Sequence, residues 1–245
     1  MERLASLSNE KVKFWTSLKE KKYRDQSGLF VIEDLHLIKE AHEKGYLETL
    51  LVNEKERIPF SFPSTYLVTP SIISKLSNTV SENKYLGIAR KPKPKKLGNR
   101  LIILDQVQDP GNVGTIIRLG LAFGFETIVF SCGCCDPYSP KTVRATQGAL
   151  FSLNIYENQD LVSLIKKLKS EHIKVYGTAL KNAEELDKFS PQNDLALVFG
   201  NEGNGMREEI IKECDSLIKI PMKTFESLNV AVAAGIIAYH FRENN

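Results

Sequence analysis

The sequence has few of the residues and runs that mark membrane, secreted or metal-bound proteins. It contains only 4 cysteines, of which Cys132, Cys134 and Cys135 are crowded together and Cys214 is distant. This spacing fits neither a disulfide framework nor the paired ligands of a zinc site. No apolar run approaches the roughly 20 residues that span a bilayer, and residues 1–8 lack the apolar stretch of a secretory signal. We therefore expect bystander thiols, no metal, no membrane association and a cytoplasmic location.

Common enzyme fingerprints are missing as well. Neither G-x-x-x-x-G-K-[ST] nor G-x-G-x-x-G occurs, which removes the usual evidence for an ATPase or a dinucleotide-binding enzyme. The histidines lie outside the glycine-rich loops and have no candidate nucleophile beside them; they are His36, His42, His172 and His240. This argues against a histidine general base and against a Ser/His or Cys/His hydrolase.

What is present indicates two globular domains of unequal charge. The length of 245 residues, with 42% hydrophobic and 26% charged residues, is ordinary for globular domains. Residues 1–98 contain 18 Lys and Arg against 12 Asp and Glu, a net charge of +6, whereas residues 99–245 contain 15 against 18, a net charge of −3. A basic N-terminal part joined to a slightly acidic part suggests a polyanion-binding module next to a separate site.

The most basic segment, residues 8–26, has cations and aromatic residues interleaved. Val12, Trp15 and Leu18 fall at helical spacing, which predicts one apolar and one basic face. A solvated helix face explains this pattern, and so does contact with an RNA backbone with stacking on the aromatic rings. The candidate RNA-binding residues here are Lys11, Lys13, Lys21, Lys22 and Arg24.

Strands and helices alternate along the whole chain, which predicts the α/β class. Residues 1–90 form a small domain with expected strands at 29–32, 47–53 and 85–89 and expected helices at 34–44 and 71–78. A linker rich in Lys and Pro occupies residues 91–98. Residues 99–245 form the second domain, with a mostly parallel sheet. Its expected strands are 101–104, 126–131, 173–178, 194–199 and 217–220, and its expected helices are 112–124, 140–150, 160–171, 207–214 and 227–242.

Two of these strands end in polar loops, which indicates a ligand crevice at the carboxyl edge of the sheet. Residues 195–199 lead into Gly200-Asn-Glu-Gly-Asn-Gly205, and residues 217–221 lead into Met222 to Asn229. Glycine lets backbone amides approach a ligand closely, although a tight turn explains such a loop equally well. Ser227 is the expected N-cap of a final helix rich in small residues.

Asn112 and Arg118 share one helix in an otherwise apolar stretch. Their spacing of six residues turns them about 600° around the helix, so they point in different directions. A buried arginine needs an anionic partner. The partner is either a structural carboxylate or a substrate phosphate, and the sequence leaves both interpretations open.

Three ordered motifs resemble the signatures of the SpoU/TrmH family, the RNA 2′-O-ribose methyltransferases of the SPOUT superfamily. The first runs from Asp105 through Asp109-Pro-Gly-Asn-Val-Gly-Thr-Ile-Ile-Arg118 to Gly124, the second is Leu197 to Met206, and the third joins Ile220-Pro-Met222 to Ser227-Leu-Asn-Val-Ala-Val-Ala233. Residues 140–145 with Gly148-Ala149 match a stretch seen between them. Residues 29–33 resemble the family's small substrate-binding domain of ribosomal protein L30e type, although Asp34 replaces the usual glycine.

The resemblance implies a deep trefoil knot in the C-terminal domain, a homodimer, and S-adenosylmethionine as cofactor. By position it assigns cofactor contacts to Thr178, Gly200, Ile220 and Leu228, and the polar active site to Asn112, Arg118, Glu202, Ser227 and Asn229. Arg144 joins the RNA-binding candidates. One departure is the loop of residues 223–226, which is one residue shorter than usual and lacks glycine.

The implied reaction is metal-free methyl transfer to a ribose 2′-hydroxyl, with ribosomal RNA favoured over transfer RNA. A guanidinium with a pKa above about 12 is a poor base, so we expect Arg118 to clamp a phosphate and the nascent alkoxide. Asn112 and Ser227 would orient the hydroxyl, and Glu202 would fix Arg118 or Asn229. The alternatives are a transfer-RNA 2′-O-methyltransferase, a silent RNA-binding or assembly protein, and an enzyme that methylates a base nitrogen.

Overall fold

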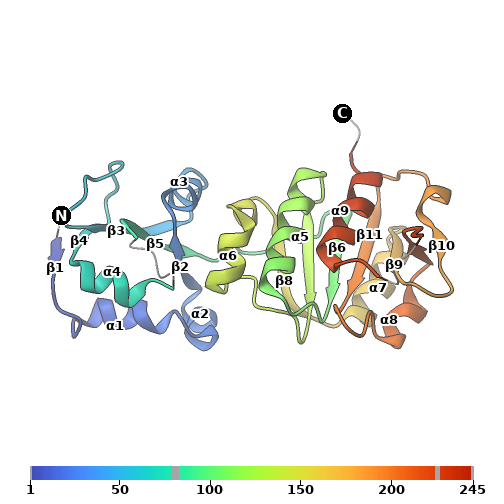
Figure 1. Cartoon of the computed structure of the whole chain (residues 1–245), viewed down its shortest axis with the longest axis horizontal. Coiled ribbons are helices and arrows are strands. Elements are labelled where there is room, and N and C mark those ends of the chain that lie inside the picture. The colour runs from blue at the N-terminus through green and yellow to red at the C-terminus, as the bar shows by residue number, and fades with distance from the viewer. Residues whose placement is uncertain (1, 79–82, 224–226, 244–245) are drawn as a thin grey trace. The chain divides into compact units, whose positions relative to one another are not determined.

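The chain divides into two compact units (Figure 1). The computed structural model describes residues 2–78, 83–223 and 227–243. The N-terminal unit comprises residues 1–92 and 136–151, and the C-terminal unit comprises residues 93–135 and 152–245. The first boundary lies inside the predicted linker. Residues 136–151 differ from the predicted division, which placed them in the second domain, because their contacts are with the N-terminal unit.

The N-terminal unit is built on a five-stranded sheet in the order β1-β4-β3-β5-β2. Strand β1 is parallel to β4 and β4 to β3, whereas β5 is antiparallel to both of its neighbours. Its elements are β1 (Glu2–Leu4), α1 (Glu10–Ser17), α2 (Lys21–Ser27), β2 (Leu29–Glu33), α3 (Leu35–Glu43), β3 (Leu47–Asn53), β4 (Thr65–Val68), α4 (Pro70–Leu76), β5 (Tyr85–Arg90), α6 (Pro140–Thr146) and the short η1 (Ala149–Phe151).

Both faces of this sheet are covered. Trp15 and Leu18 from the α1 region and Ile72 from α4 pack with Val31 and Leu51 on one face. Helices α3 and α6 contact β2, and the alternate residues of that strand are buried too. The covering of both faces explains why β2 reads as an almost continuous apolar run.

The C-terminal unit is built on a seven-stranded, all-parallel sheet in the order β10-β12-β9-β11-β6-β7-β8. This confirms the predicted α/β class with a parallel sheet. Its elements are β6 (Arg100–Asp105), α5 (Pro110–Ala122), β7 (Thr127–Ser131), β8 (Asn154–Gln159), α7 (Leu161–Ser170), β9 (Lys174–Thr178), β10 (Glu184–Glu185), η2 (Leu186–Lys188), β11 (Leu195–Gly200), α8 (Glu208–Glu213), β12 (Ser216–Lys219) and α9 (Val230–His240).

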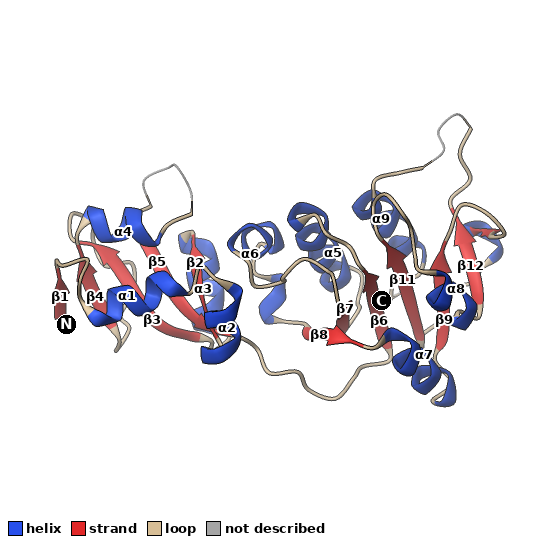
Figure 2. Cartoon of the chain, turned by 90° about the horizontal axis from the view of Figure 1, so that it is seen from below, coloured by secondary structure: helices blue, strands red, loops and turns tan. Residues whose placement is uncertain are grey.

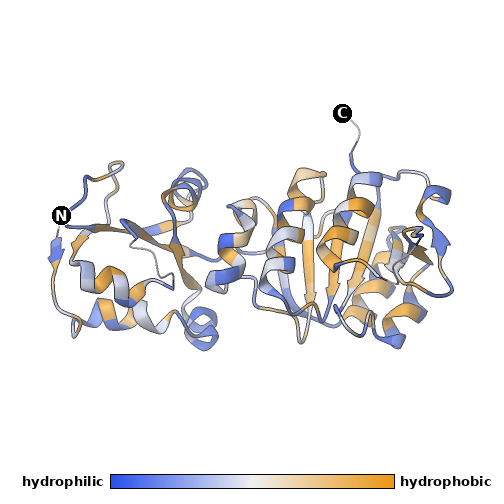
Figure 3. Cartoon of the chain, in the orientation of Figure 1, coloured by the Kyte–Doolittle hydropathy of each residue, from blue (hydrophilic) through white to orange (hydrophobic). Residues whose placement is uncertain are grey.

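Helices flank this sheet on both sides, with α5 and α9 on one face and α7 and α8 on the other (Figure 2). Strands β6 and β11 are buried along their whole length. Figure 3 shows these central strands and helix α9 in the colour of hydrophobic residues. The alternation of strand and helix, read from the sequence, thus places β6, β9, β11 and β12 side by side with their carboxyl ends at one edge.

The structure differs from the sequence-based elements in a few places. Strands β1, β4, β8 and β10 were not predicted, and the basic segment 8–26 is two helices rather than one. The break between α1 and α2 has a local cause, because the Arg24 side chain donates hydrogen bonds to the carbonyl groups of Leu18 and Lys19. These carbonyls turn toward the guanidinium instead of continuing the helix.

Among the described residues, no helix combines the length and the apolar character needed to cross a membrane. The trefoil knot that the resemblance implies stays a prediction.

Candidate functional site

A pocket of about 260 Å³ lies at the carboxyl edge of the C-terminal sheet. Its walls come from the ends of β9, β11 and β12, from the glycine-rich loop after β11 and from the start of α9. The predicted crevice is therefore present. Seven of the residues assigned to the site line this pocket: Thr178, Gly200, Glu202, Ile220, Ser227, Leu228 and Asn229.

The glycine-rich loop folds back onto the end of β11. The backbones of Asn201 and Gly205 exchange two hydrogen bonds of 3.0 and 2.9 Å, and Gly205 has a φ of +69°. A Cβ atom on Gly200 would lie 2.2 Å from the backbone of Gly205 and of Met206. No side chain fits at position 200, so the backbone itself forms this wall of the pocket.

Two side chains tie the loop to strand β6. The Asn201 amide donates to the carbonyl of Gln106 and accepts from the backbone of Gly203 and Asn204. The buried Asp105 carboxylate accepts from the backbone N–H of Arg207 at 2.9 Å and from its Nε at 2.8 Å. Sequence reasoning gave neither residue a role. An asparagine followed two residues later by glycine is typical of an Asx turn, and that signal indicates Asn201.

Three of the predicted polar residues form one hydrogen-bonded chain. Glu202 accepts from the Asn112 side chain at 3.0 Å and from the backbone N–H groups of Gln108 and Asp109. Asn112 in turn accepts from the Asn229 side chain at 3.0 Å. The Asn229 oxygen accepts from the first N–H groups of α9, those of Ala231 and Val232. Loops after β6 and β11 and the start of α9 are thereby joined.

The two ends of this hydrogen-bonded series determine which group donates and which accepts in each bond. A carboxylate such as that of Glu202 only accepts, so Asn112 must offer it an N–H. The helix N-terminus only donates, so Asn229 must offer it the side-chain oxygen. Asn112 therefore presents its oxygen to Asn229, and one N–H and one lone pair of its amide are left for a substrate.

Asp109 caps α5 by accepting from the Asn112 backbone. Two sequence-based assignments are corrected by this geometry. Asn229, not Ser227, caps α9. Glu202 binds Asn112 and two backbone amides rather than Arg118 or Asn229. The departure at residues 223–226 cannot be placed, since residues 224–226 lie outside the described residues.

Glu202 is held as a charged acceptor. Burial pushes the pKa of its carboxyl upward, but hydrogen bonds from the Asn112 side chain and from the loop backbone outweigh burial and bring the pKa below its usual range. A carboxylate with a lowered pKa is a weak base at neutral pH. Glu202 is therefore suited to positioning the loops rather than to accepting a proton.

Arg118 lies apart from the pocket. Its side chain is exposed, it does not line the pocket, and it makes no ion pair or side-chain hydrogen bond with a residue that the structure describes. Within the described ranges, therefore, no carboxylate forms the structural salt bridge that the sequence left open for this arginine. Leu121, one turn further along α5, is 42% exposed on the same side of the helix.

The candidate RNA-binding residues of the N-terminal unit fall into three groups. Lys13, Lys22 and Arg144 are exposed. Lys11 is exposed too but bonds to Glu2 and Tyr66, and Lys21 pairs with Asp25. Arg24 needs a correction: only 4% of its side chain is exposed, and its guanidinium is held by Asp136 and two carbonyl groups. It cannot contact RNA from that position.

Comparison with known proteins gives matches over both units. Residues 99–239 match the SpoU rRNA Methylase family, and residues 9–96 match the MRM3-like substrate binding domain. The RlmP protein of Bacillus subtilis, a 23S rRNA (guanosine(2553)-2′-O)-methyltransferase, is 35% identical, and the match covers 99% of this chain and 100% of the relative. An uncharacterized tRNA/rRNA methyltransferase of Synechocystis is 30% identical over 98% of this chain and 93% of its own length.

A solved structure gives the same result. The AdoMet-bound rRNA methyltransferase from Sinorhizobium meliloti is 28% identical, with a TM-score of 0.85, and the match covers 98% of this chain and 96% of that one. The residues that carry the family motifs form the glycine-rich wall of the pocket and the hydrogen bonds that join Glu202, Asn112 and Asn229. Both lie at one edge of the seven-stranded parallel sheet. The chain belongs to the SpoU rRNA methylase family.

Proposed function

We propose that this chain transfers a methyl group from S-adenosylmethionine to a ribose 2′-hydroxyl of ribosomal RNA. The observation that carries the proposal is that the pocket and the Glu202–Asn112–Asn229 chain meet at one edge of the parallel sheet. Glu202 and Asn229 belong to both. A relative that covers the whole chain is named for this reaction on 23S rRNA.

The residues of the pocket fit S-adenosylmethionine. Phe199, Ile218, Ala233 and Ile237 supply apolar surface for a flat base, and Gly200 adds a wall of bare backbone because the close packing of Gly205 and Met206 leaves no room for a Cβ there. Backbone groups at Ile220 and Leu228 would hold the adenine edge of the cofactor. The polar residues at the rim of the pocket would hold its charged amino-acid end. The volume is close to the lower end of small-molecule pockets, roughly 300–1,000 Å³.

The chemistry then divides between cofactor and protein. When bound, S-adenosylmethionine supplies a methyl group on a sulfonium, which leaves as a neutral thioether. The protein must orient the 2′-hydroxyl and stabilise the charge that develops on its oxygen as the proton passes to water. Asn112 offers one N–H and one lone pair for the orientation, and Glu202 and Asn229 fix that amide from both sides.

Arg118 would supply a cation near the reacting hydroxyl, from a second copy of this chain. Helix α9 carries three exposed apolar side chains at helical spacing, Val232, Ile236 and Tyr239, next to the exposed Leu121 of α5. Burial of this face against the same face of a partner gives a symmetric homodimer. Since Arg118 is exposed on α5 and does not line its own pocket, the partner's pocket is where we place its guanidinium.

Ribosomal RNA is the substrate we favour over transfer RNA, because the relative matched along its whole length acts on 23S rRNA. This substrate would place the protein in the cytoplasm, where four free thiols are expected. A transfer-RNA substrate is the second candidate, supported by the Synechocystis relative whose name includes both RNAs.

The test is transfer of labelled methyl from S-adenosylmethionine to RNA from cells that lack the gene. We expect wild type to place label in nuclease-resistant 2′-O-methyl dinucleotides, and Asn112→Ala to lose at least about tenfold in rate. Gln108→Ala is the matched control, because only the backbone of Gln108 bonds to Glu202.

Other outcomes select the alternatives. Label on a base would identify a base methyltransferase on the same fold, and label only in transfer RNA would identify the second substrate. Measurable cofactor binding with no label on deproteinised RNA or on ribosomal particles would favour a silent RNA-binding protein.

A further inference from the structure

Residues 136–151 belong to the methyltransferase region by sequence but to the N-terminal unit by structure. The SpoU match runs through them, from residue 99 to residue 239. Yet α6 packs on β2, and the turn at Gln147 and Gly148, both with positive φ, leads into η1. Its residues Ala149, Leu150 and Phe151 are buried. Phe151 lies 6.0 Å from the ring of Phe30 and 5.6 Å from that of Tyr46.

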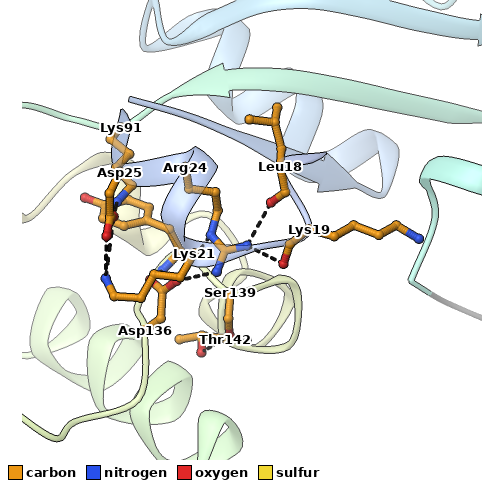
Figure 4. Close-up of polar contacts among 10 residues, drawn as sticks. Leu18, Lys19, Lys21, Arg24, Asp25, Lys91, Asp136, Ser139 and Thr142 are labelled. Atoms are coloured by element: carbon orange, nitrogen blue, oxygen red, sulfur yellow. Dashed lines mark hydrogen bonds and ion pairs between the residues drawn. The ribbon is translucent and has the colours of Figure 1, made fainter. Parts of the chain in front are cut away.

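A buried ion pair fastens the start of this segment. Arg24 of α2 bonds to Asp136 through Nε at 3.2 Å and Nη2 at 2.5 Å, and the two side chains are 4% and 10% exposed (Figure 4). Its other guanidinium nitrogen donates to the carbonyls of Leu18 and Lys19 at 2.7 Å. The second Asp136 oxygen accepts from the backbone of Tyr138. The pair therefore fixes the approach to α6 as well as the bend between α1 and α2.

The aromatic ring of Tyr138 strengthens this attachment. Tyr138 is 2% exposed, and its ring centroid lies 5.1 Å from that of Phe30. The ammonium of Lys91 makes a cation–π contact with the Tyr138 ring, 4.6 Å from the centroid. Lys91 also pairs with Asp25 of α2. Segment 136–151 is thus held by charge, by ring contacts and by burial, all within the N-terminal unit.

The charge that remains exposed on the segment is positive. Asp136 is its only acidic residue, and the charge of that carboxylate is balanced by its ion pair with Arg24. Lys141 and Arg144 are exposed at a spacing of three on one side of α6. Neither cation pairs with a side chain in the described part of the chain. Two uncompensated cations in a fixed row suit a phosphodiester backbone.

We propose that residues 136–151 are part of the RNA-binding surface of the N-terminal unit. Lys141 and Arg144 contact phosphates of the RNA backbone, and Arg24 with Asp136 are positioning residues that hold α6 in the place where these contacts form. The inference rests on the proposed function, because it assumes an RNA substrate.

The first experiment measures binding of a fluorescein-labelled RNA stem–loop across a range of salt concentrations. For the double variant Lys141→Gln with Arg144→Gln, we expect weaker binding and a smaller salt slope of log affinity. The slope should fall by about 1 for each phosphate that is no longer neutralised, so by about 2 in total. The affinity for S-adenosylmethionine should not change, because its pocket lies wholly in the C-terminal unit. Both side chains are exposed, so the variant should fold.

A matched control removes the same charge elsewhere in the N-terminal unit. Lys44 and Lys55 are exposed cations outside segment 136–151, and their double change to glutamine should leave the salt slope near the wild-type value. If the Lys141 and Arg144 variant binds RNA like this control, the proposed contact is overturned. That result is distinct from failure of the proposed function, in which no RNA receives a methyl group.

The second experiment tests positioning with Asp136→Asn, which keeps an acceptor for Tyr138 but weakens the hold on Arg24. We expect a higher KM for 23S rRNA with little change in kcat. In the Asp136→Asn background, the Lys141 and Arg144 changes should weaken RNA binding less than they do in wild type. Additive effects would show that Asp136 does not act through α6 and would overturn the positioning role. Should Asp136→Asn not fold, Arg24→Lys in the same cycle replaces it.

Discussion

At position 200 the backbone leaves no space for a methyl group. A Cβ there would meet backbone atoms at 2.2 Å, whereas a Cβ on Gly203 would meet only the Asn201 oxygen, at 3.6 Å. We expect Gly200→Ala to displace the loop, to lower stability by about 1–3 kcal/mol or more, and to weaken S-adenosylmethionine binding at least about tenfold. Calorimetric titration and thermal unfolding measure both effects. Gly203→Ala should behave like wild type, and equal damage by the two would refute the steric explanation.

The thiol of Cys214 should make the stability of the fold depend on pH in the alkaline range. Burial, with the neighbouring Asp215 charge, raises the pKa of its thiol to about 12. The unfolded thiol ionises near pH 8.5, so above that pH the unfolded chain releases a proton that the folded chain keeps. Stability should fall between about pH 8.5 and pH 12, with a slope of at most about 1.4 kcal/mol per pH unit from this group.

Cys214→Ala should flatten that decline, as measured by urea unfolding at several pH values. Part of the slope should remain, because burial raises the pKa of Cys134 in the same direction. An unchanged alkaline slope in Cys214→Ala would contradict the assignment.

At the scale of elements, helix α9 depends on Asn229 for two separate things. The Asn229 oxygen caps the helix, and its Nδ2 donates to Asn112. Asn229→Asp keeps the capping oxygen but loses the donor, so we expect near wild-type stability with methyl transfer reduced at least about tenfold. Asn229→Ala should lose the same activity and about 1 kcal/mol of stability as well. Unfolding curves beside initial rates separate the two, and an active Asp variant would count against the network.

For the whole molecule, the exposed face of α9 predicts assembly. Ile236 is 40% exposed between Val232 and Tyr239, which are 52% and 55% exposed. Ile236→Asp should leave the fold intact but convert the proposed homodimer into monomers, as measured by sedimentation equilibrium. If the wild-type protein sediments as a monomer at all accessible concentrations, the proposed homodimer is contradicted.

The same scale predicts where Arg118 acts. The Arg118→Ala subunit retains an intact pocket, and the Gly200→Ala subunit retains Arg118. At a cofactor concentration too low to fill the Gly200→Ala pocket, each proposed homodimer alone should therefore be nearly inactive. After subunit exchange between equal amounts, about a quarter of wild-type methyl transfer should return, because half the dimers hold one complete site. No recovery despite confirmed exchange would place Arg118 in its own subunit's pocket.

The local pattern of the sequence determined the elements around the site. Apolar runs predicted β6 and β11, and the glycine-rich loop predicted the pocket wall, whereas Asn112, Glu202 and Asn229 were assigned only through the resemblance to the family. These features could be predicted because strand formation and tight turns depend on a few neighbouring residues. The short strands β1, β4 and β10 could not, since their two to four residues carry little pattern of their own, and β8 is an edge strand of mostly polar residues.

The tertiary structure decided which partner each polar group has. Arg24 reads as a surface cation of a basic helix, but it is buried against Asp136, 112 residues away. Asn112 meets Glu202 across 90 residues and Asn229 across 117. Segment 136–151 sits among methyltransferase motifs yet packs with the N-terminal unit. Such contacts join residues that only folding brings together, so no short stretch of sequence records them. For Arg24 and Asp136, burial also makes the loss of either partner costly.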